Sequence, residues 1–321
     1  MPARDIIVIG ASAGGTEAIR KLVAGFPADL PASVFVTIHI PSNRGGILPA
    51  IITSAGPLVA VHPQDGEPIR HGRIYVAPPD YHLLIRNDHV HLGHGPRENL
   101  QRPCINVMFR SAANSYGERV AGVLLTGLLD DGAAGLWEIQ QHNGATIVQE
   151  PEEAPYRSMP DSAIRGLNVQ YIERVAQMGP LLMKLAQANE AQQRQPAPQP
   201  VSNESTTQTC PECGGVMTST RMGKLFEYRC HVGHRFGLRT LIDQKSKNIE
   251  RLLEGALAQS EELTAALKMA REHPEAQDID AIEREVQRRQ REQQLLRSLS
   301  GNPSDAPLLT PETMGTTGSI E

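Results

Sequence analysis

The stretch that decides the fold is Ile6-Ile7-Val8-Ile9-Gly10-Ala11-Ser12-Ala13-Gly14, near the start of a chain of 321 residues. Its aliphatic residues predict a buried strand. The G-x-S-x-G that follows is typical of a sharp turn that lifts a serine hydroxyl out of the sheet. We expect a helix over 15–24 to direct its free N–H groups at the same place. The turn is therefore a candidate nucleophile elbow; the alternative is a glycine-rich turn that binds a phosphate or only connects.

The glycine spacing excludes two other glycine-rich turns. The glycines fall at Gly10, Gly14 and Gly15, which does not match the G-x-G-x-x-G of dinucleotide-binding folds, and no lysine follows as a P-loop requires. The elbow of α/β-hydrolases also differs, because it comes after several strands and its partners follow in the order Ser, Asp, His. The base and the orienting acid must therefore lie elsewhere in the chain.

Two further apolar runs end in residues that could complete a triad. His39 lies near the end of the run over 34–40, and Asp130 and Asp131 follow the run over 120–127. Runs buried on both faces are typical of a parallel sheet, whose sites gather at the carboxyl ends of the strands. A hydroxyl nucleophile needs a base, and the base needs an acid that fixes its tautomer. The alternatives are an ordinary strand-end histidine, a different histidine as base, and aspartates that only cap the next helix.

Several motifs connect these candidates to a known family. They read I-G-A-S-A-G-G-T-E-A-I at 9–19, I-H-I-P at 38–41 and L-T-G-L-L-D-D-G-A-A-G at 125–135, with weaker matches at 65–69, 74–84 and 102–113. On these motifs, residues 4–186 resemble the catalytic domain of CheB-type protein-glutamate methylesterases.

The resemblance implies a role for each candidate. Ser12 would be the nucleophile, His39 its base and Asp131 the acid that orients His39. Backbone N–H groups of Ala13 and of the Leu128 region would stabilise the oxyanion. The resemblance also implies a Rossmann-like fold and no cofactor for catalysis.

One position departs from the family's pattern. The aspartate loop of the family usually reads G-M-G-x-D-G, whereas this chain has Gly127-Leu128-Leu129-Asp130-Asp131-Gly132. If the replaced glycine had a positive φ, Leu129 would be strained in its place. The change bears on the oxyanion contacts and on the substrate range.

Composition and periodicity divide the chain into residues 1–186, 187–209, 210–240, 241–299 and 300–321. Strand-like and helical segments alternate over the first part and predict an α/β domain with a doubly wound, mostly parallel sheet and a hairpin around Asn87-Asp88. Aromatic residues make up only 4% of the chain, so its core must consist mainly of aliphatic side chains. Residues 187–209 predict a flexible linker and residues 300–321 a disordered tail.

Three of the four cysteines gather in residues 210–240 and indicate a metal site. Cys210, Cys213 and Cys230, with His234 as the favoured fourth ligand over His231, fit the spacing of a zinc ribbon. A disulfide explains them poorly, because three cysteines leave one unpaired. Four protein ligands close the coordination sphere, so we expect the zinc to be structural.

The apolar residues of the segment over 241–272 recur at helical spacing. His273-Pro274 ends this helix, and a poorer stripe continues over a charged helix to residue 299. A helical hairpin that closes on itself is the favoured arrangement, and a short dimeric coiled coil is the alternative.

Charge and hydropathy exclude several partners. The net charge of −5 gives no overall basic field for nucleic acid or a membrane surface, and the basic surplus within residues 210–240 is mild. No apolar run approaches the roughly 20 residues of a membrane span. A strand that starts within the first residues leaves no room for a signal peptide. We therefore expect a cytoplasmic protein without membrane insertion.

The resemblance implies a hydrolase that removes methyl groups from glutamate esters of a methyl-accepting receptor protein and that can also deamidate glutamine. We expect a stand-alone form without the family's receiver domain, in which residues 210–299 recruit the receptor or another signalling protein. The alternative is a signalling adaptor that is non-catalytic or has altered specificity and that uses this fold and the metal module for docking.

Overall fold

The computed structural model describes residues 4–39, 45–187, 201–272 and 278–299. They belong to two compact units, divided between Asp243 and Gln244. The first unit holds the sheets, and the second holds most of two long helices.

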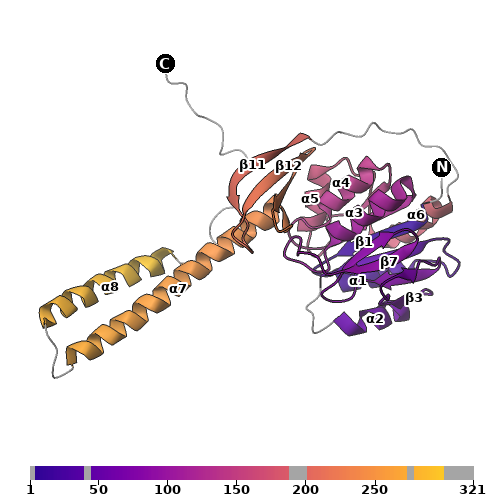
Figure 1. The fold of residues 1–321 in the computed structure, drawn as a ribbon. Coiled ribbons are helices and arrows are strands. Elements are labelled where there is room, and N and C mark those ends of the chain that lie inside the picture. The colour runs from indigo at the N-terminus through magenta and orange to yellow at the C-terminus, as the bar shows by residue number, and fades with distance from the viewer. Residues whose placement is uncertain (1–3, 40–44, 188–200, 273–277, 300–321) are drawn as a thin grey trace, which may run out of the picture. The chain divides into compact units, whose positions relative to one another are not determined.

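A seven-stranded sheet forms the centre of the first unit (Figure 1). Its strands follow the order β10-β9-β8-β1-β2-β5-β3, and every neighbouring pair is parallel. The bounds are β10 (Tyr171–Glu173), β9 (Ala145–Gln149), β8 (Val120–Leu124), β1 (Ile6–Ala11), β2 (Ser33–Ile38), β5 (Arg73–Val76) and β3 (Val59–Val61). Every residue of β1, β2 and β8 is buried, as the unbroken apolar runs predict.

Helices cover both faces of this sheet. One apolar cluster joins it to α1 (Gly15–Ala24), α2 (Leu48–Ala55) and α6 (Val175–Gln187). A second cluster joins the opposite face to α3 (Ile105–Tyr116), α4 (Ala133–Gln141) and α5 (Ser158–Gly166). Short 3₁₀ turns, η1 (Gly45–Ile47) and η2 (Gly117–Arg119), precede α2 and β8. The layers confirm the predicted doubly wound α/β fold.

A small antiparallel sheet of β4 (Glu67–Pro68), β7 (His89–Gly93) and β6 (His82–Arg86) packs into the second apolar cluster. Asn87 and Asp88 join β6 to β7 with φ values of 51° and 56°. Positive φ at both central residues is typical of a tight hairpin turn, so the hairpin predicted there is confirmed.

A four-stranded antiparallel sheet of β11 (Val201–Thr209), β12 (Val216–Met222), β13 (Leu225–Cys230) and β14 (Arg235–Gly237) follows in the chain. We call residues 201–240 the Cys/His module. The prediction of a linker through residue 209 is wrong for 201–209, because pairing with β12 satisfies the backbone of this polar segment. Residues 188–200 lie outside the described residues.

The Cys/His module belongs to the same compact unit as the central sheet, whereas the flexible linker predicted over 187–209 implied that the two would be separate. Met222, at the turn between β12 and β13, is buried in the second apolar cluster. A Cβ atom on Gly166 would lie only 2.3 Å from the side chain of Leu225, so glycine at the end of α5 permits this close approach. The expected separation is wrong because apolar side chains of the module pack against α4 and α5.

The two long helices are α7 (Leu238–Glu272), which begins in the first unit, and α8 (Ile279–Leu299). Within the second unit they run side by side (Figure 1). The buried Gln293 amide of α8 donates to the Ser260 carbonyl at 2.9 Å and to the Thr264 hydroxyl at 2.8 Å. The helices therefore form the favoured hairpin. The tail predicted over 300–321 and the His273-Pro274 break lie outside the described residues. Among the described helices, none combines the length and apolar character that a bilayer crossing requires.

Candidate active site

Three neighbouring strands of the central sheet bring the predicted triad together. Ser12 follows β1, His39 follows β2 and Asp131 lies seven positions after β8, and these strands are adjacent in the order β8-β1-β2. The His39 imidazole lies between the other two side chains. Its Nδ1 is 3.2 Å from Ser12 Oγ and its Nε2 is 2.8 Å from Asp131 Oδ2. The chain reverses its winding direction at β1, which is where sites form in such sheets.

The partners of the imidazole define its proton positions. Asp131 as a carboxylate can only accept, so His39 Nε2 carries a proton and donates it there. In the neutral ring, Nδ1 is then free to accept the hydroxyl proton of Ser12. This is the tautomer that a base needs in order to activate a serine.

The turn after β1 is tied to the end of β8. The Ser12 N–H donates to the Thr126 carbonyl at 3.0 Å, and the Thr126 hydroxyl donates to the Ala13 carbonyl at 3.1 Å. A Cβ atom on Gly127 would lie 2.8 Å from the Ser12 Cβ, so glycine is what allows the two segments to approach. Gly14 takes a φ of 74° immediately before α1. The serine therefore sits on a tightly braced elbow.

Asp131 is buried among donors from several elements. Its carboxylate accepts hydrogen bonds from His39 Nε2, the Ile105, Asn106 and Gly132 N–H groups, the Asn99 amide and the Cys104 thiol. Burial by itself would raise the pKa of Asp131. The interactions with His39 and the other donors outweigh burial and lower the pKa to about 2. The carboxylate is thus ionised and fixed.

Three of these donors were missed from the sequence. Cys104 is fully buried, as expected, but its thiol also donates to Asp131 at 3.1 Å, and burial raises its pKa. Asn106 accepts from the Gly132 and Gly135 N–H groups at 3.0 and 2.7 Å and so braces the loop that carries Asp131. Cys104 and Asn106 belong to the weak family match at 102–113, which is the signal that could have found them. Asn99 had no such signal.

Leu129 has the positive φ at which the sequence predicts strain for a leucine. Its φ is 64°, in the left-handed region. Its carbonyl oxygen accepts from the Ser158 and Ser162 hydroxyls, each at 3.1 Å. These two bonds offset part of the backbone strain and hold the aspartate loop on the path that places Asp131.

One alternative reading of the sequence was that Asp130 caps the helix that follows it. The Asp130 side chain does not do so. Its buried carboxylate accepts from the Arg239 N–H at 2.9 Å and from the N–H and hydroxyl of Thr240. These groups belong to the first turn of α7, whose free N–H groups and positive dipole end favour a carboxylate. Burial nevertheless raises the pKa of Asp130. Asp130 binds these groups because docking of the Cys/His module places the start of α7 beside it.

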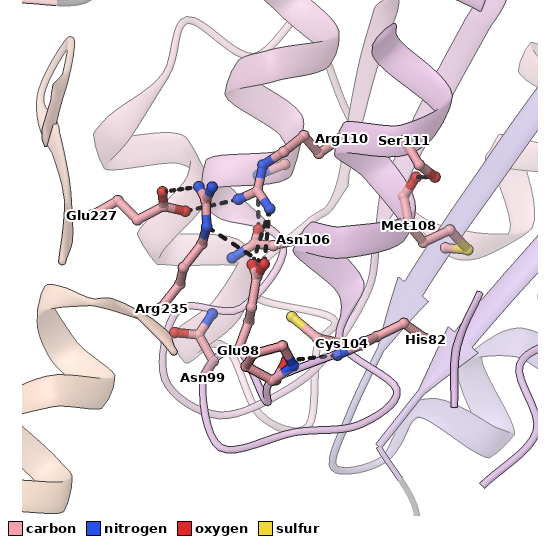
Figure 2. Close-up of polar contacts among 12 residues, drawn as sticks. His82, Glu98, Asn99, Cys104, Asn106, Met108, Arg110, Ser111, Glu227 and Arg235 are labelled. Carbon is pink, nitrogen blue, oxygen red and sulfur yellow. Dashed lines mark hydrogen bonds and ion pairs between the residues drawn. The ribbon is translucent and has the colours of Figure 1, made fainter. Parts of the chain in front are cut away.

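A buried ion cluster of Glu98, Arg110, Glu227 and Arg235 joins the module to α3 (Figure 2). Arg110 contacts Glu98 at 3.0 Å and Glu227 at 2.8 Å. Burial raises the pKa of Glu98, and the two arginines oppose that effect. Two acids and two bases compensate one another, so the cluster buries no net charge.

The module also gathers the predicted metal ligands. Cys210, Cys213, Cys230 and His234 place their ligand atoms within 4.8 Å of one another. The His234 Nδ1 lies 3.7 Å from Cys210 Sγ and 3.5 Å from Cys230 Sγ, and the two sulfurs of Cys213 and Cys230 are 3.7 Å apart. Ligand atoms around a tetrahedral zinc ion with bonds of about 2.3 Å are separated by about 3.7 Å, so the group has the size of a zinc site.

His234 rather than His231 is the histidine that the structure includes in this group. Its second ring nitrogen, Nε2, lies 3.1 Å from a Glu212 carboxylate oxygen. A carboxylate in that position fixes the tautomer and leaves Nδ1 available for a metal.

Comparison with known proteins identifies the family. The CheB methylesterase family matches residues 7–182, so the chain belongs to the CheB methylesterase family. A Methanosarcina mazei protein named protein-glutamate methylesterase/protein-glutamine glutaminase 2 is 34% identical over 190 residues, 57% of this chain and 52% of that protein. A Leptospira interrogans relative is 35% identical over 186 residues, 58% of this chain and 96% of its own length.

A solved structure shows the same fold. The crystal structure of the Thermotoga maritima CheB methylesterase catalytic domain matches with a TM-score of 0.55 and 28% identity, over 58% of this chain and 99% of that one. The family resemblance drawn from the sequence is thereby confirmed. The chain spans about half the length of several relatives, including the Methanosarcina protein. The Cys/His module and the long helices lie beyond the residues that the family matches.

Proposed function

We propose that this chain is a serine hydrolase that demethylates γ-glutamyl methyl esters on a receptor protein. The observation that carries the proposal is the His39 imidazole placed between Ser12 Oγ and Asp131 Oδ2, at 3.2 and 2.8 Å. Family membership supports the ester substrate, because relatives carry the name protein-glutamate methylesterase. We propose a receptor protein as the bearer of this ester.

The first half of the reaction forms an acyl-enzyme. Ser12 Oγ attacks the ester carbonyl while His39 Nδ1 takes its proton, and Asp131 stabilises the imidazolium through Nε2. The tetrahedral intermediate places a negative charge on the former carbonyl oxygen. The Ala13 N–H and an N–H from the Leu128 region are the proposed donors to it.

The second half releases the products. His39 returns the proton to the methoxide, methanol leaves, and the glutamyl group stays on Ser12 as an ester. Water then attacks that ester while His39 takes its proton, and His39 gives this proton to Ser12 Oγ as the bond to the acyl carbon breaks and the glutamate carboxylate is released. A glutamine side chain would form the same acyl-enzyme with ammonia as the leaving group, in keeping with the relatives' names. The assembled triad gives no support to a purely non-catalytic adaptor.

We further propose that Cys210, Cys213, Cys230 and His234 hold a structural zinc ion. The tetrahedral spacing of the ligand atoms and the Glu212 carboxylate behind His234 support it. Zinc would supply no step of the ester chemistry there, because four protein ligands complete its coordination.

Residues 210–299 are the proposed recruiting surface for the receptor or another signalling protein. Several apolar side chains of α7 support this, because Leu252 and Met269 are 72% and 69% exposed.

A fluorophosphonate probe tests the hydrolase at low cost, since it reacts only with an activated serine. Wild-type protein should be labelled on Ser12 and should release methanol from a methyl-esterified receptor fragment. Ser12→Ala should lose both while keeping its fold, because Ser12 lies on a turn. Ser54→Ala, in an exposed part of α2, is the matched control and should keep both. Methanol release at the wild-type rate by Ser12→Ala would rule out the proposed mechanism.

A further inference from the structure

Asn99 joins the Cys/His module to the acid of the triad. Its amide nitrogen donates to Asp131 Oδ1 at 3.0 Å, and its amide oxygen accepts from the Gly237 N–H at 2.8 Å. Its own N–H donates to the Arg235 carbonyl at 2.7 Å. The side chain is 5% exposed. Only this amide orientation satisfies both neighbours, because one is a carboxylate and the other an N–H group.

A second connection runs through the neighbouring aspartate. Asp130, adjacent to Asp131 in the chain, is held by Arg239 and Thr240 at the start of α7. A Cβ atom on Gly237 would lie 2.3 Å from Asp130 Oδ2, so this position requires glycine for the carboxylate to approach. Residues 235–240 therefore contact the acid loop on two sides.

The ion cluster fastens these residues in place. Arg235 contacts Glu98, which directly precedes Asn99, and also Glu227 of β13 (Figure 2). Arg110 of α3 contacts both glutamates. His234, a proposed metal ligand, immediately precedes Arg235. The segment is thus anchored from the module and from the catalytic domain.

We propose that Asn99 is a positioning residue of the triad and that residues 235–240 complete the active site by holding it. The hydrogen bond from the Asn99 amide to Oδ1 adds to those from Cys104, Asn106 and Gly132, and it restrains rotation of the Asp131 carboxylate so that Oδ2 stays directed at His39. The inference rests on the proposed function only in taking the Ser12–His39–Asp131 triad as catalytic. It gives the Cys/His module a part in the chemistry besides recruitment.

The fold itself does not explain the contact. The Thermotoga maritima catalytic domain is matched over 99% of its length by 58% of this chain, so the same fold forms in a chain without an equivalent module. The hydrogen bond from the Gly237 N–H to the Asn99 side chain is an addition to that fold. It reaches the same side chain that donates to Asp131.

Asn99→Ala and Asn99→Asp form the decisive pair. Asn99→Ala should lower kcat for a small ester about 10- to 100-fold, with KM within about twofold of wild type. Asn99→Asp keeps an acceptor for the Gly237 N–H but places a second carboxylate against Asp131. Its kcat should therefore fall at least as far as that of Asn99→Ala. A merely structural role through Gly237 would be preserved in Asn99→Asp. Asn143→Ala removes another asparagine of positive φ, away from the triad, and should leave kcat unchanged.

Two further readouts separate positioning from general damage. In an Asp131→Asn background, Asn99→Ala should change kcat less than about twofold, because no carboxylate remains to be positioned. The NMR resonance of the His39 Nε2 proton, recorded without substrate, should shift in both Asn99 variants.

The outcomes distinguish this inference from the proposed function. A wild-type protein that hydrolyses esters, together with Asn99 variants that retain kcat and the His39 resonance, would overturn the positioning role alone. Equal losses in the wild-type and Asp131→Asn backgrounds would also overturn it. A shifted His39 resonance in a protein that cleaves no glutamyl ester would support the positioning role and reject the proposed substrate. If Asn99→Ala fails to fold, kcat and the His39 resonance are measured in Asn99→Asp, which keeps the hydrogen bond from the Gly237 N–H.

Discussion

Asp131→Asn should change how the stability of the protein depends on pH. Burial opposes ionisation of Asp131, but His39 and the other donors lower its pKa from 3.8 to about 2. A carboxyl group with a lowered folded-state pKa contributes stability above its unfolded pKa and loses it as the pH falls through the folded pKa. The change from 3.8 to about 2 corresponds to about 2 kcal/mol of stability near neutral pH.

Urea unfolding between about pH 7 and about pH 3 measures this contribution. The free energy of unfolding is determined for wild type and for Asp131→Asn, and the difference between them is followed. The difference should shrink by about 1 kcal/mol by pH 3, because roughly half of the Asp131 contribution is lost there. Other acid effects, including loss of a metal from the cysteine ligands, occur in both proteins and cancel.

Asp130→Asn is the matched control. Burial raises the pKa of Asp130, so the contribution of this carboxyl group is lost as the pH rises, and the corresponding difference moves in the opposite direction. A wild-type advantage over Asp131→Asn that stays constant from pH 7 to pH 3 would refute the reasoning. It would show that the surrounding donors do not favour the ionised form of Asp131.

Three further outcomes are expected. Leu129→Gly should be about 1 kcal/mol more stable to urea than Leu129→Ala, because only glycine adopts the φ of 64° freely; equal stabilities would contradict the strain. Purified protein should carry about one zinc per chain by mass spectrometry, and Cys213→Ser should lose it. Chelation should speed amide hydrogen exchange at residues 235–240 but not in β1, and unchanged exchange in metal-free protein would count against the site. Gln293→Ala should weaken the α7–α8 hairpin by about 1 kcal/mol in thermal unfolding, since it removes the hydrogen bonds that the buried Gln293 amide donates to Ser260 and Thr264, whereas the exposed Gln290→Ala should have little effect.

Local sequence was sufficient to predict that the three residues of the proposed triad lie together. Ser12, His39 and Asp131 each follow an apolar run, and the carboxyl ends of parallel strands meet at one edge of a sheet. The family motifs then distinguished Asp131 from Asp130. The strain at Leu129 could also be anticipated, because it depends on the backbone of a single residue.

The surroundings of Asp131 could not be predicted in the same way. Asn99 has no periodicity or motif that marks it as a partner of a carboxylate 32 positions away, and the weak family match that contains Cys104 does not by itself assign that residue a contact with a carboxylate 27 positions away. They acquire that role only when the segment before α3 packs against the end of β8. Residues 201–209 have the composition of a linker and become a strand only because β12 offers a partner.

Spacing along the chain determined which side chains share an element, a strand end or a ligand set, because those relations repeat with the geometry of helices, strands and tight turns. The tertiary structure alone decided that Asp130, with the same carboxylate as Asp131, binds the first turn of α7 110 positions away. The physical reason is that a buried carboxylate takes its hydrogen bonds from whichever donors packing brings within reach. Those donors depend on how distant surfaces meet, which no local pattern encodes.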